Sequence, residues 1–384
     1  MKTKLFLLAA IMIASFTSCL KDESVTITHN YDPEDYKVIA ANLNLPDEVD
    51  NYTLNLPQTV GGFEVFADNK QATLGRVLFY DKRLSVNNEV NCASCHKPEL
   101  AFTDGEQFSP GVTTERTSRN TLALGTFPSF NAYYGFGGTR MFWDNRASSV
   151  MEQSAETMKN PVEMGNVDLG ELADKLLQEQ YYFILFKNAF PYQTYLTNEE
   201  KMLTALQAFV SSIGCFNSKY DQELIDNHGD ETAQFAKFTA QENQGKALYN
   251  TNCASCHNLG AVAFSLGIVA ANNGLDLDYQ DEGVGAISNL QPENGVFKVP
   301  MLRNIELTAP YMHDGRFATL EQVVEHYSSG IKNHPNLHEN LKDSGSPKQL
   351  NLNESDKQAL VAFLRTLTDK ESLLATRYSD PFKH

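Results

Sequence analysis

The chain has 384 residues, of which 42% are hydrophobic and 10% aromatic, enough for two folded domains with substantial cores. Its 48 acidic residues outnumber its 31 basic ones, and the formal net charge is −17. Such an acidic chain lacks the basic surface that a phosphate backbone requires, which excludes nucleic acid as a partner. The charge favours small molecules and basic proteins instead.

The first residues predict an export signal. Lys2 and Lys4 precede an apolar run over 5–13 that is too short to span a bilayer. We therefore expect residues 1–18 to be a lipoprotein signal peptide and Cys19 to be lipidated, with an ordinary secretory signal as the alternative. In both cases the protein reaches the cell envelope, in the periplasm or on the outer membrane, and a lipid at Cys19 is its only predicted membrane attachment.

The rest of the chain contains an internal repeat. Residues 19–60 are polar, contain three prolines and are expected to form a tether. After them, a run of Gly, a basic residue, Leu and an aromatic residue occurs twice, at 75–80 and 245–249, and each run leads into Cys-Ala-Ser-Cys-His. This duplication predicts two related domains, over 61–228 and 229–384.

The hydrophobic pattern is helical. Apolar residues recur at three- and four-residue spacing over 202–213 and 360–367, and 172–186 is a further candidate helix. Sustained alternation of period two is rare. We therefore expect an all-α fold in which Gly- and Asn-rich stretches such as 126–139 and 261–295 form long loops around a large ligand.

The string Cys-Ala-Ser-Cys-His carries the chemistry. Its spacing is that of c-type haem attachment, in which two thiols bind the vinyl groups of one porphyrin and the adjacent His is an axial ligand of the iron. A zinc site, a redox dithiol and a disulfide are the alternatives, but zinc prefers four matched ligands, a dithiol needs no His, and a disulfide at this spacing is strained. We therefore expect two cytochrome c-type domains with two covalent haems, one on Cys92, Cys95 and His96 and one on Cys253, Cys256 and His257.

From about 74 to 367 the chain resembles the bacterial di-haem cytochrome c peroxidase family, which includes the MauG enzymes. The resemblance implies that the first haem reduces hydrogen peroxide and that the second receives electrons from a small donor protein such as a cytochrome c. The strings that carry it are Leu74-Gly75-Arg76, Phe102-Thr103-Asp104-Gly105, Arg119-Asn120-Thr121, Phe142-Trp143-Asp144-Asn145-Arg146, Asn160-Pro161-Val162-Glu163-Met164 and the run from Val299 to Gly315.

The resemblance also implies roles for single residues. Glu163 matches a distal residue that moves a proton between the two oxygens of peroxide. Trp143, the only Trp in the chain, matches a residue that passes electrons between the haems. Asn120, with the carbonyl groups of Thr308 and Pro310, matches a calcium site between the domains.

Further residues match the surroundings of the second haem. Tyr327 is assigned as its sixth ligand, because MauG has Tyr at this position where other members have Met. A phenolate stabilises ferric iron and lowers the reduction potential. His326, Met301 and Met312 are the alternatives. His313 matches a residue near the same haem, where hydrogen bonding to a propionate suits it better than iron ligation.

One departure from the family bears on function. Many members have a His in the loop after the first haem that blocks the iron, but this chain has no His between His96 and His228. We therefore expect the first iron to have an open distal face at rest. The leading function is a peroxidase. A MauG-like oxidase that modifies a protein or small substrate and a di-haem electron carrier without catalysis are the alternatives, and a homodimer is left open.

Overall fold

The computed structural model describes residues 31–60, 62, 64–125, 140–257, 259 and 270–384. The predicted signal peptide and Cys19 lie outside these residues. Within the described part of the chain, no helix is both long and apolar enough to cross a membrane.

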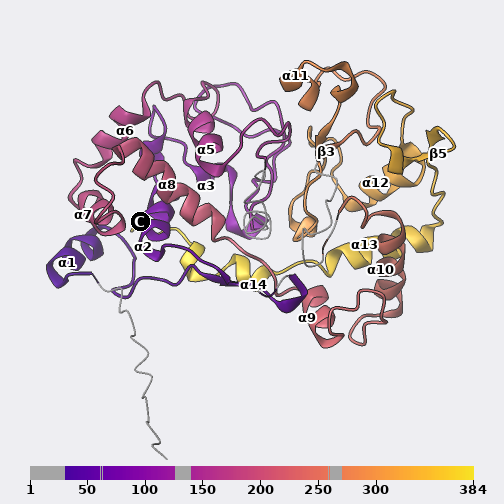
Figure 1. Ribbon diagram of the computed structural model, residues 1–384, viewed down its shortest axis with the longest axis horizontal. Helices are drawn as coiled ribbons and strands as arrows, with labels where there is room; N and C mark the ends of the chain where they lie inside the picture. Colours follow the sequence, from indigo (N-terminus) through magenta and orange to yellow (C-terminus); the bar gives the residue numbers. More distant parts are fainter. Residues whose placement is uncertain (1–30, 61, 63, 126–139, 258, 260–269) are drawn as a thin grey trace, which may run out of the picture.

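The described residues form helices joined by long loops, which confirms the predicted all-α fold (Figure 1). We call the residues before 229 the first half and those from 229 the second half. The α-helices of the first half are α1 (Pro33–Asn42), α2 (Asn69–Tyr80), α3 (Cys92–Cys95), α5 (Val150–Lys159), α6 (Leu169–Leu176), α7 (Gln180–Ala189), α8 (Asn198–Ser211) and α9 (Lys219–Asp226). Those of the second half are α10 (Ala240–Asn252), α11 (Val284–Ser288), α12 (Leu320–Glu325), α13 (Glu354–Arg365) and α14 (Lys370–Leu373).

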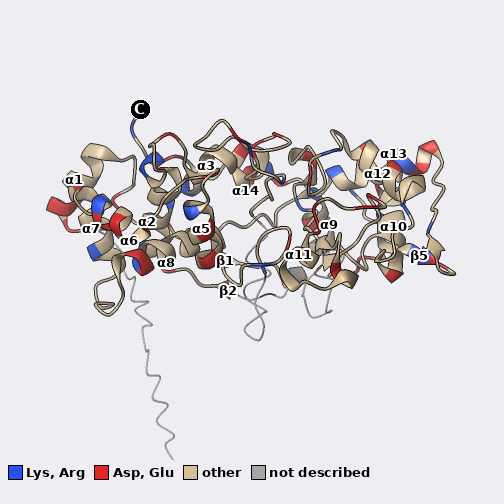
Figure 2. Ribbon diagram, turned by 90° about the horizontal axis from the view of Figure 1, so that it is seen from above, with Lys and Arg blue, Asp and Glu red and all other residues tan. Residues whose placement is uncertain are grey.

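Strands are few and short. In the described residues, three antiparallel pairs of two-residue strands are present: β1 (Leu54–Asn55) with β2 (Glu64–Val65), β3 (Ala270–Ala271) with β4 (Phe297–Lys298), and β5 (Lys342–Asp343) with β6 (Ser346–Pro347). The two halves lie next to each other along the long axis of the molecule, and acidic and basic residues are distributed over both (Figure 2). Two large apolar cores are present in the described residues, one formed mainly by the first half and one mainly by the second half, to which Tyr220 and Leu224 of α9 also belong.

Equivalent helix crossings show that the sequence repeat is also a structural repeat. In the first half α2 crosses α8, where a Cβ atom on Gly75 would lie 2.0 Å from the carbonyl oxygen of Ala205. In the second half α10 crosses α13, where a Cβ atom on Gly245 would lie 1.9 Å from the carbonyl oxygen of Ala359. Both approaches are too close for any side chain, so the two positions require glycine.

The predicted helices are present with one difference. The pattern over 202–213 falls on α8, and the pattern over 360–367 falls on α13 and the turn after it. The candidate over 172–186 is two helices, α6 and α7, because the chain turns at 177–179. The apolar spacing continues through the turn, so it carries no signal of the break.

Residues 31–60 are not the tether that the sequence predicted. Asp32 caps α1 by accepting a hydrogen bond from the N–H of Glu34, and Ile39, Leu43 and Tyr52 are buried in the core of the first half. The segment wraps around that half with irregularly spaced contacts. Its buried residues therefore follow no helical or strand period, which is why composition alone suggested a tether.

The end of the chain returns to the first half. We call residues 370–384 the C-terminal strap; near its end Phe382 pairs with Leu43, which follows α1, so the chain terminus lies against the first half (Figure 1). Tyr378 is buried in the core of the first half, and its hydroxyl donates to the carbonyl of Ser212 at 2.7 Å. Arg76 of α2 donates from Nε to the carbonyl of Ser379 at 2.7 Å. The last residues of the predicted second domain thus complete the core of the first half.

Candidate active site

A cavity of about 450 Å³ lies in the first half next to the first Cys-Ala-Ser-Cys-His motif. Cys92, Cys95 and His96 line it together with Asn120, Trp143 and Glu163, so the structure brings six predicted site residues into one place. The second half contributes to the wall as well, through Lys298, Met301 and Arg303.

Both motif histidines are oriented for iron ligation. Nδ1 of His96 lies 2.7 Å from the carbonyl oxygen of Phe102, and Nδ1 of His257 lies 2.9 Å from that of Pro300. Because a carbonyl only accepts, Nδ1 carries the proton in both rings and Nε2 keeps its lone pair for a metal. Burial lowers the pKa of both imidazoles and outweighs these hydrogen bonds, so both rings favour the neutral form that ligates.

The remaining groups around the motifs fit covalent haem. The four motif thiols are free, as thioether attachment requires, so neither motif forms a disulfide. Among the described residues, no three His, Cys, Asp or Glu side chains gather as a zinc site requires. The buried Nε of Arg303 makes no hydrogen bond with the described residues, and a haem propionate in the cavity that Arg303 lines is a partner that fits it.

The residue that holds His96 was not found from the sequence. Ala101 and Phe102 both have positive φ, 54° and 60°, and are fully buried. Such a backbone costs about 1–3 kcal/mol per residue unless packing enforces it. Here the Phe102 ring contacts the rings of Phe79 and Tyr378 edge-on, with centroids 6.2 Å away in each case. The C-terminal strap therefore helps to fix the carbonyl that orients His96.

Glu163 lies in a turn directly after α5. Asn160, the C-cap of α5, accepts the N–H of Val162 at 2.9 Å and donates from Nδ2 to Oε1 of Glu163 at 3.2 Å. Burial raises the pKa of the Glu163 carboxyl, against a hydrogen bond from Thr157 and the charge of Arg146, which lower it. The turn thus holds a carboxyl that protonates more readily than an ordinary glutamate.

A second, more open cavity of about 570 Å³ adjoins the first. The two cavities share Arg146, Thr157, Asn160 and Glu163 as lining residues. Glu163 therefore borders both the inner cavity and a solvent-facing pocket, where its carboxyl can exchange protons with water.

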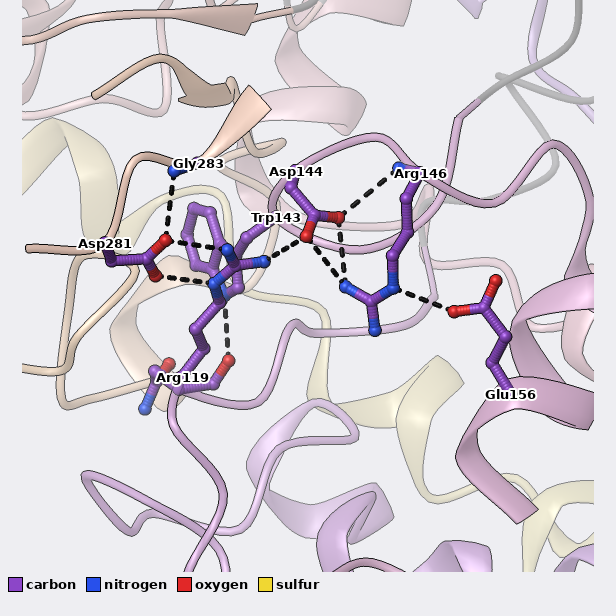
Figure 3. A network of polar contacts seen from close by, with 8 residues as sticks. Arg119, Trp143, Asp144, Arg146, Glu156, Asp281 and Gly283 are labelled. Carbon is purple, nitrogen blue, oxygen red and sulfur yellow. Dashed lines mark hydrogen bonds and ion pairs between the residues drawn. The ribbon is translucent and has the colours of Figure 1, made fainter. Parts of the chain in front are cut away.

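Trp143 lies between the two halves. Its indole Nε1 donates to the carbonyl of Asn120 at 2.8 Å (Figure 3). Its own carbonyl accepts the N–H of Lys298 in β4 at 2.7 Å. The ring belongs to a third apolar cluster whose other buried members, Leu275, Tyr279 and Phe297, come from the second half, while Leu122 of the first half packs against it. This placement agrees with a residue between two haems.

A chain of ion pairs passes Trp143, and no local sequence pattern predicts it (Figure 3). Asp281 of the second half pairs with Arg119 at 2.7 Å, and Arg119 pairs with Asp144 at 2.6 Å. Asp144 also pairs with Arg146, and Arg146 with Glu156, both at 2.8 Å. The network therefore runs from the second half to the mouth of the cavity at Glu163.

The predicted calcium residues lie near the boundary of the halves. Asn120 donates its backbone N–H to the carbonyl of His313 at 2.8 Å and its Nδ2 to the carbonyl of Glu106 at 2.9 Å. Thr308, which lies two residues before Pro310, donates a hydrogen bond from its hydroxyl to the carbonyl of Ile305 at 3.2 Å. These contacts do not test calcium binding, which stays a prediction.

His313 is buried at the same boundary. Its ring stacks on Phe297 with centroids 3.7 Å apart and an interplanar angle of 14°. Burial lowers the pKa of this imidazole. No contact of His313 in the described residues tests the predicted hydrogen bond to a propionate of the second haem.

Tyr327 lies in a π-helical turn, His326–Gly330, that continues α12. Such turns are frequent at functional sites. Burial raises the pKa of Tyr327 to about 12; Asn273 opposes this with a hydrogen bond, while Cys253 and Cys256 add to it. The phenol thus lies within electrostatic range of both thiols of the second motif, while its ligation of the second haem stays a prediction.

The three alternative ligands of the second haem make other contacts in the structure. Nε2 of His326 lies 3.0 Å from the carbonyl oxygen of Asn273 and so donates its proton there, which leaves Nε2 itself without a lone pair for iron. Met301 lines the cavity of the first half. Met312 accepts a hydrogen bond at Sδ from Asn273 at 3.5 Å, and Asn273 also hydrogen-bonds to Tyr327.

Comparison with known proteins matches both halves. Residues 69–229 match the family model described as di-haem cytochrome c peroxidase, and residues 243–368 match the model of cytochrome c. The chain is 31% identical to methylamine utilization protein MauG of Paracoccus denitrificans, over 79% of this chain and 90% of that protein. It is 32% identical to cytochrome c551 peroxidase of Nitrosomonas europaea, over 77% of this chain and 79% of that protein.

A solved structure has a fold similar to that of this chain. The crystal structure of a MauG-like protein associated with microbial copper homeostasis aligns with a TM-score of 0.68 and 32% sequence identity. The alignment covers 81% of this chain and 93% of that chain.

Proposed function

The chain belongs to the di-haem cytochrome c peroxidase family, a family of oxidoreductases that act on peroxide, and from this premise we propose its reaction and electron route. The proposed reaction is the reduction of hydrogen peroxide to two waters in the cavity of the first half, with two protons and two electrons. A small donor protein such as a cytochrome c delivers the electrons at the motif of His257. The observation that carries the proposal is the buried carboxyl of Glu163 in the same cavity as Cys92, Cys95 and His96.

The protein's own residues supply the proton chemistry. A haem on Cys92, Cys95 and His96 would supply the iron that binds peroxide and the electrons that cleave its O–O bond. Glu163 accepts the proton of one peroxide oxygen at its carboxylate and returns it to the other oxygen, which leaves as water. The amide of Asn160 keeps Oε1 of Glu163 oriented during this exchange.

Trp143 is the proposed link between the two haem motifs. Its indole is held by Asn120 and is surrounded by apolar residues of the second half, an arrangement that supports passage of electrons between the sites of His257 and His96. The net charge of −17 favours a basic donor whose association weakens as salt is added.

Several finer features belong to the same proposal. We propose that Asn120 binds calcium with the carbonyls of Thr308 and Pro310, which is supported by the contacts of Asn120 with both halves. We also propose that Tyr327 is the sixth ligand of the second haem. The mature protein would be anchored in the cell envelope by a lipid at Cys19.

A MauG-like oxidase is the second candidate function. It is favoured by the position of Tyr327 beside the second motif and by the absence of a His between His96 and His228. An electron carrier without catalysis does not fit, because the family acts on peroxide and Glu163 borders the cavity next to His96.

Rapid mixing of the haem-loaded protein with peroxide and reduced cytochrome c tests the proposal. We expect Glu163→Gln to slow peroxide reduction about 10²–10⁴-fold, since the amide cannot shuttle the proton. Glu152→Gln, the same change on α5, should react like the unmodified protein. If Glu163→Gln retains full activity, the proposed proton role is wrong; if the unmodified protein completes only a few turnovers per minute, the oxidase is favoured.

A further inference from the structure

An ion pair between the two halves has the geometry to fix the surroundings of Trp143 (Figure 3). Arg119 donates from Nε and Nη2 to the two carboxylate oxygens of Asp281, at 2.7 and 2.8 Å. Its remaining donor nitrogen, Nη1, donates to Asp144 at 2.6 Å. Because the guanidinium is a planar fork, paired contacts with one carboxylate set both its position and its orientation.

Arg119 reaches Trp143 by two separate connections. Asn120, the next residue after Arg119, provides the carbonyl that accepts the indole N–H at 2.8 Å. Asp144, the next residue after Trp143, is held by Arg119 and its side chain is only 4% exposed. The position of Arg119 therefore affects both the carbonyl that accepts the indole N–H and the backbone to which the indole is attached.

Asp281 is itself held rigidly in the second half. Its Oδ1 accepts the N–H of Gly283 at 3.0 Å, directly before α11 begins. Gly283 has a φ of 57°, and a Cβ atom there would lie 2.2 Å from the carbonyl oxygen of Val296, so the turn has little freedom. Burial acts to raise the pKa of Asp281, but hydrogen bonds from Arg119 and Gly283 lower it overall, so the carboxylate is charged.

We propose that Asp281 is a positioning residue for electron transfer: through Arg119 it holds the Trp143 indole between the two haem motifs, although Asp281 does not line the cavity. The inference rests on the proposed function, in which Trp143 carries electrons. Without the carboxylate, Arg119 keeps a single anionic partner, and the loop that ends in Asn120 loses its fixed orientation. A displacement of about 1 Å at a reacting group can cost about 10²-fold in rate.

The test uses Asp281→Asn in the haem-loaded protein with two measurements. The first is the rate at which the reduced second haem is oxidised after rapid mixing with peroxide, and the second is the ultraviolet resonance Raman spectrum of the indole. Trp143 is the only Trp in the chain, so its bands report one ring and its Nε1 hydrogen bond without overlap. We expect the rate to fall about tenfold or more, and the indole bands to shift towards a weaker hydrogen bond.

A matched control is available in the same loop. Asp276 pairs with Arg316 at 2.5 Å and with Lys332 at 3.0 Å, all within the second half. We expect Asp276→Asn to leave both measurements unchanged. Asp281→Glu, which keeps the charge, should recover most of the rate.

The outcomes separate the inference from the proposed function on which it rests. If Trp143→Phe slows oxidation of the second haem but Asp281→Asn leaves the rate or the indole bands unchanged, the positioning role is wrong and the electron route stands. If Trp143→Phe does not slow oxidation, the electron route is wrong and the positioning role falls with it. Should Asp281→Asn fail to fold, Arg119→Lys, which keeps the charge but loses the fork, is read by the same two measurements.

Discussion

At the scale of single residues, Glu163 is a carboxyl that the protein makes harder to ionise. Burial raises its pKa above the ordinary value of 4.5, so the deprotonated form that accepts a proton from peroxide becomes populated at higher pH. We expect the rate of the peroxide step to rise with pH along a limb centred above 4.5. Stopped-flow measurements across the acidic range check this, and the limb should be absent in Glu163→Gln. A limb that persists in the variant belongs to another group.

Residues of the site differed in how far the sequence could predict them. The motifs of His96 and His257 are contiguous, so their spacing alone indicates haem attachment. Phe102 acts through its backbone carbonyl, which every residue type has, so its identity does not reveal this role. Arg119 and Asp281 are 162 residues apart, and their pairing depends on how the halves meet. Such long-range contacts produce no periodicity or local pattern from which they could be inferred.

At the scale of elements, the π-helical turn after α12 contains the predicted sixth ligand of the second haem. Tyr327 lies in that turn, and a phenolate ligand stabilises ferric iron whereas a thioether ligand raises the potential. We therefore expect Tyr327→Met to raise the reduction potential of the second haem in a spectroscopic redox titration. Met312→Leu should leave the potential unchanged. The reverse result would identify Met312 as the ligand.

The two helix crossings make a paired prediction about stability. At Gly75 and Gly245 an added methyl group would overlap a backbone carbonyl that cannot move independently of its helix. We expect Gly75→Ala and Gly245→Ala each to lower the free energy of unfolding by about 1–3 kcal/mol or more, measured by chemical denaturation. Gly170→Ala in α6 is the control, since its Cβ would meet only the side chains of Asp168 and Glu199.

Element prediction succeeded where burial follows a regular period and failed where it does not. α8 and α13 bury one face along their length, so their apolar spacing identifies them. The segment 31–60 buries Ile39, Leu43 and Tyr52 at uneven intervals while it wraps around the first half. A segment that wraps in this way can be predicted only when the surface that it covers is already known.

At the scale of the whole molecule, the C-terminal strap ties the stability of the first half to the end of the chain. Tyr378 is fully buried there, and truncation of a buried aromatic residue costs about 3–5 kcal/mol. We expect Tyr378→Ala to increase hydrogen exchange in α2 and α8 and to leave α10 and α13 protected. Tyr192→Ala, at a position that is 86% exposed, is the control. Equal loss of protection in all four helices would show that the strap stabilises both halves.

The position of the C-terminal strap also sets the order in which the two halves can complete their folding during synthesis. Synthesis proceeds from the N terminus, so Phe102 is made before Tyr378, the strap residue that packs on its ring. The second Cys-Ala-Ser-Cys-His motif lies between these two residues in the sequence. The core around the carbonyl that orients His96 can therefore close only after both motifs have been synthesised.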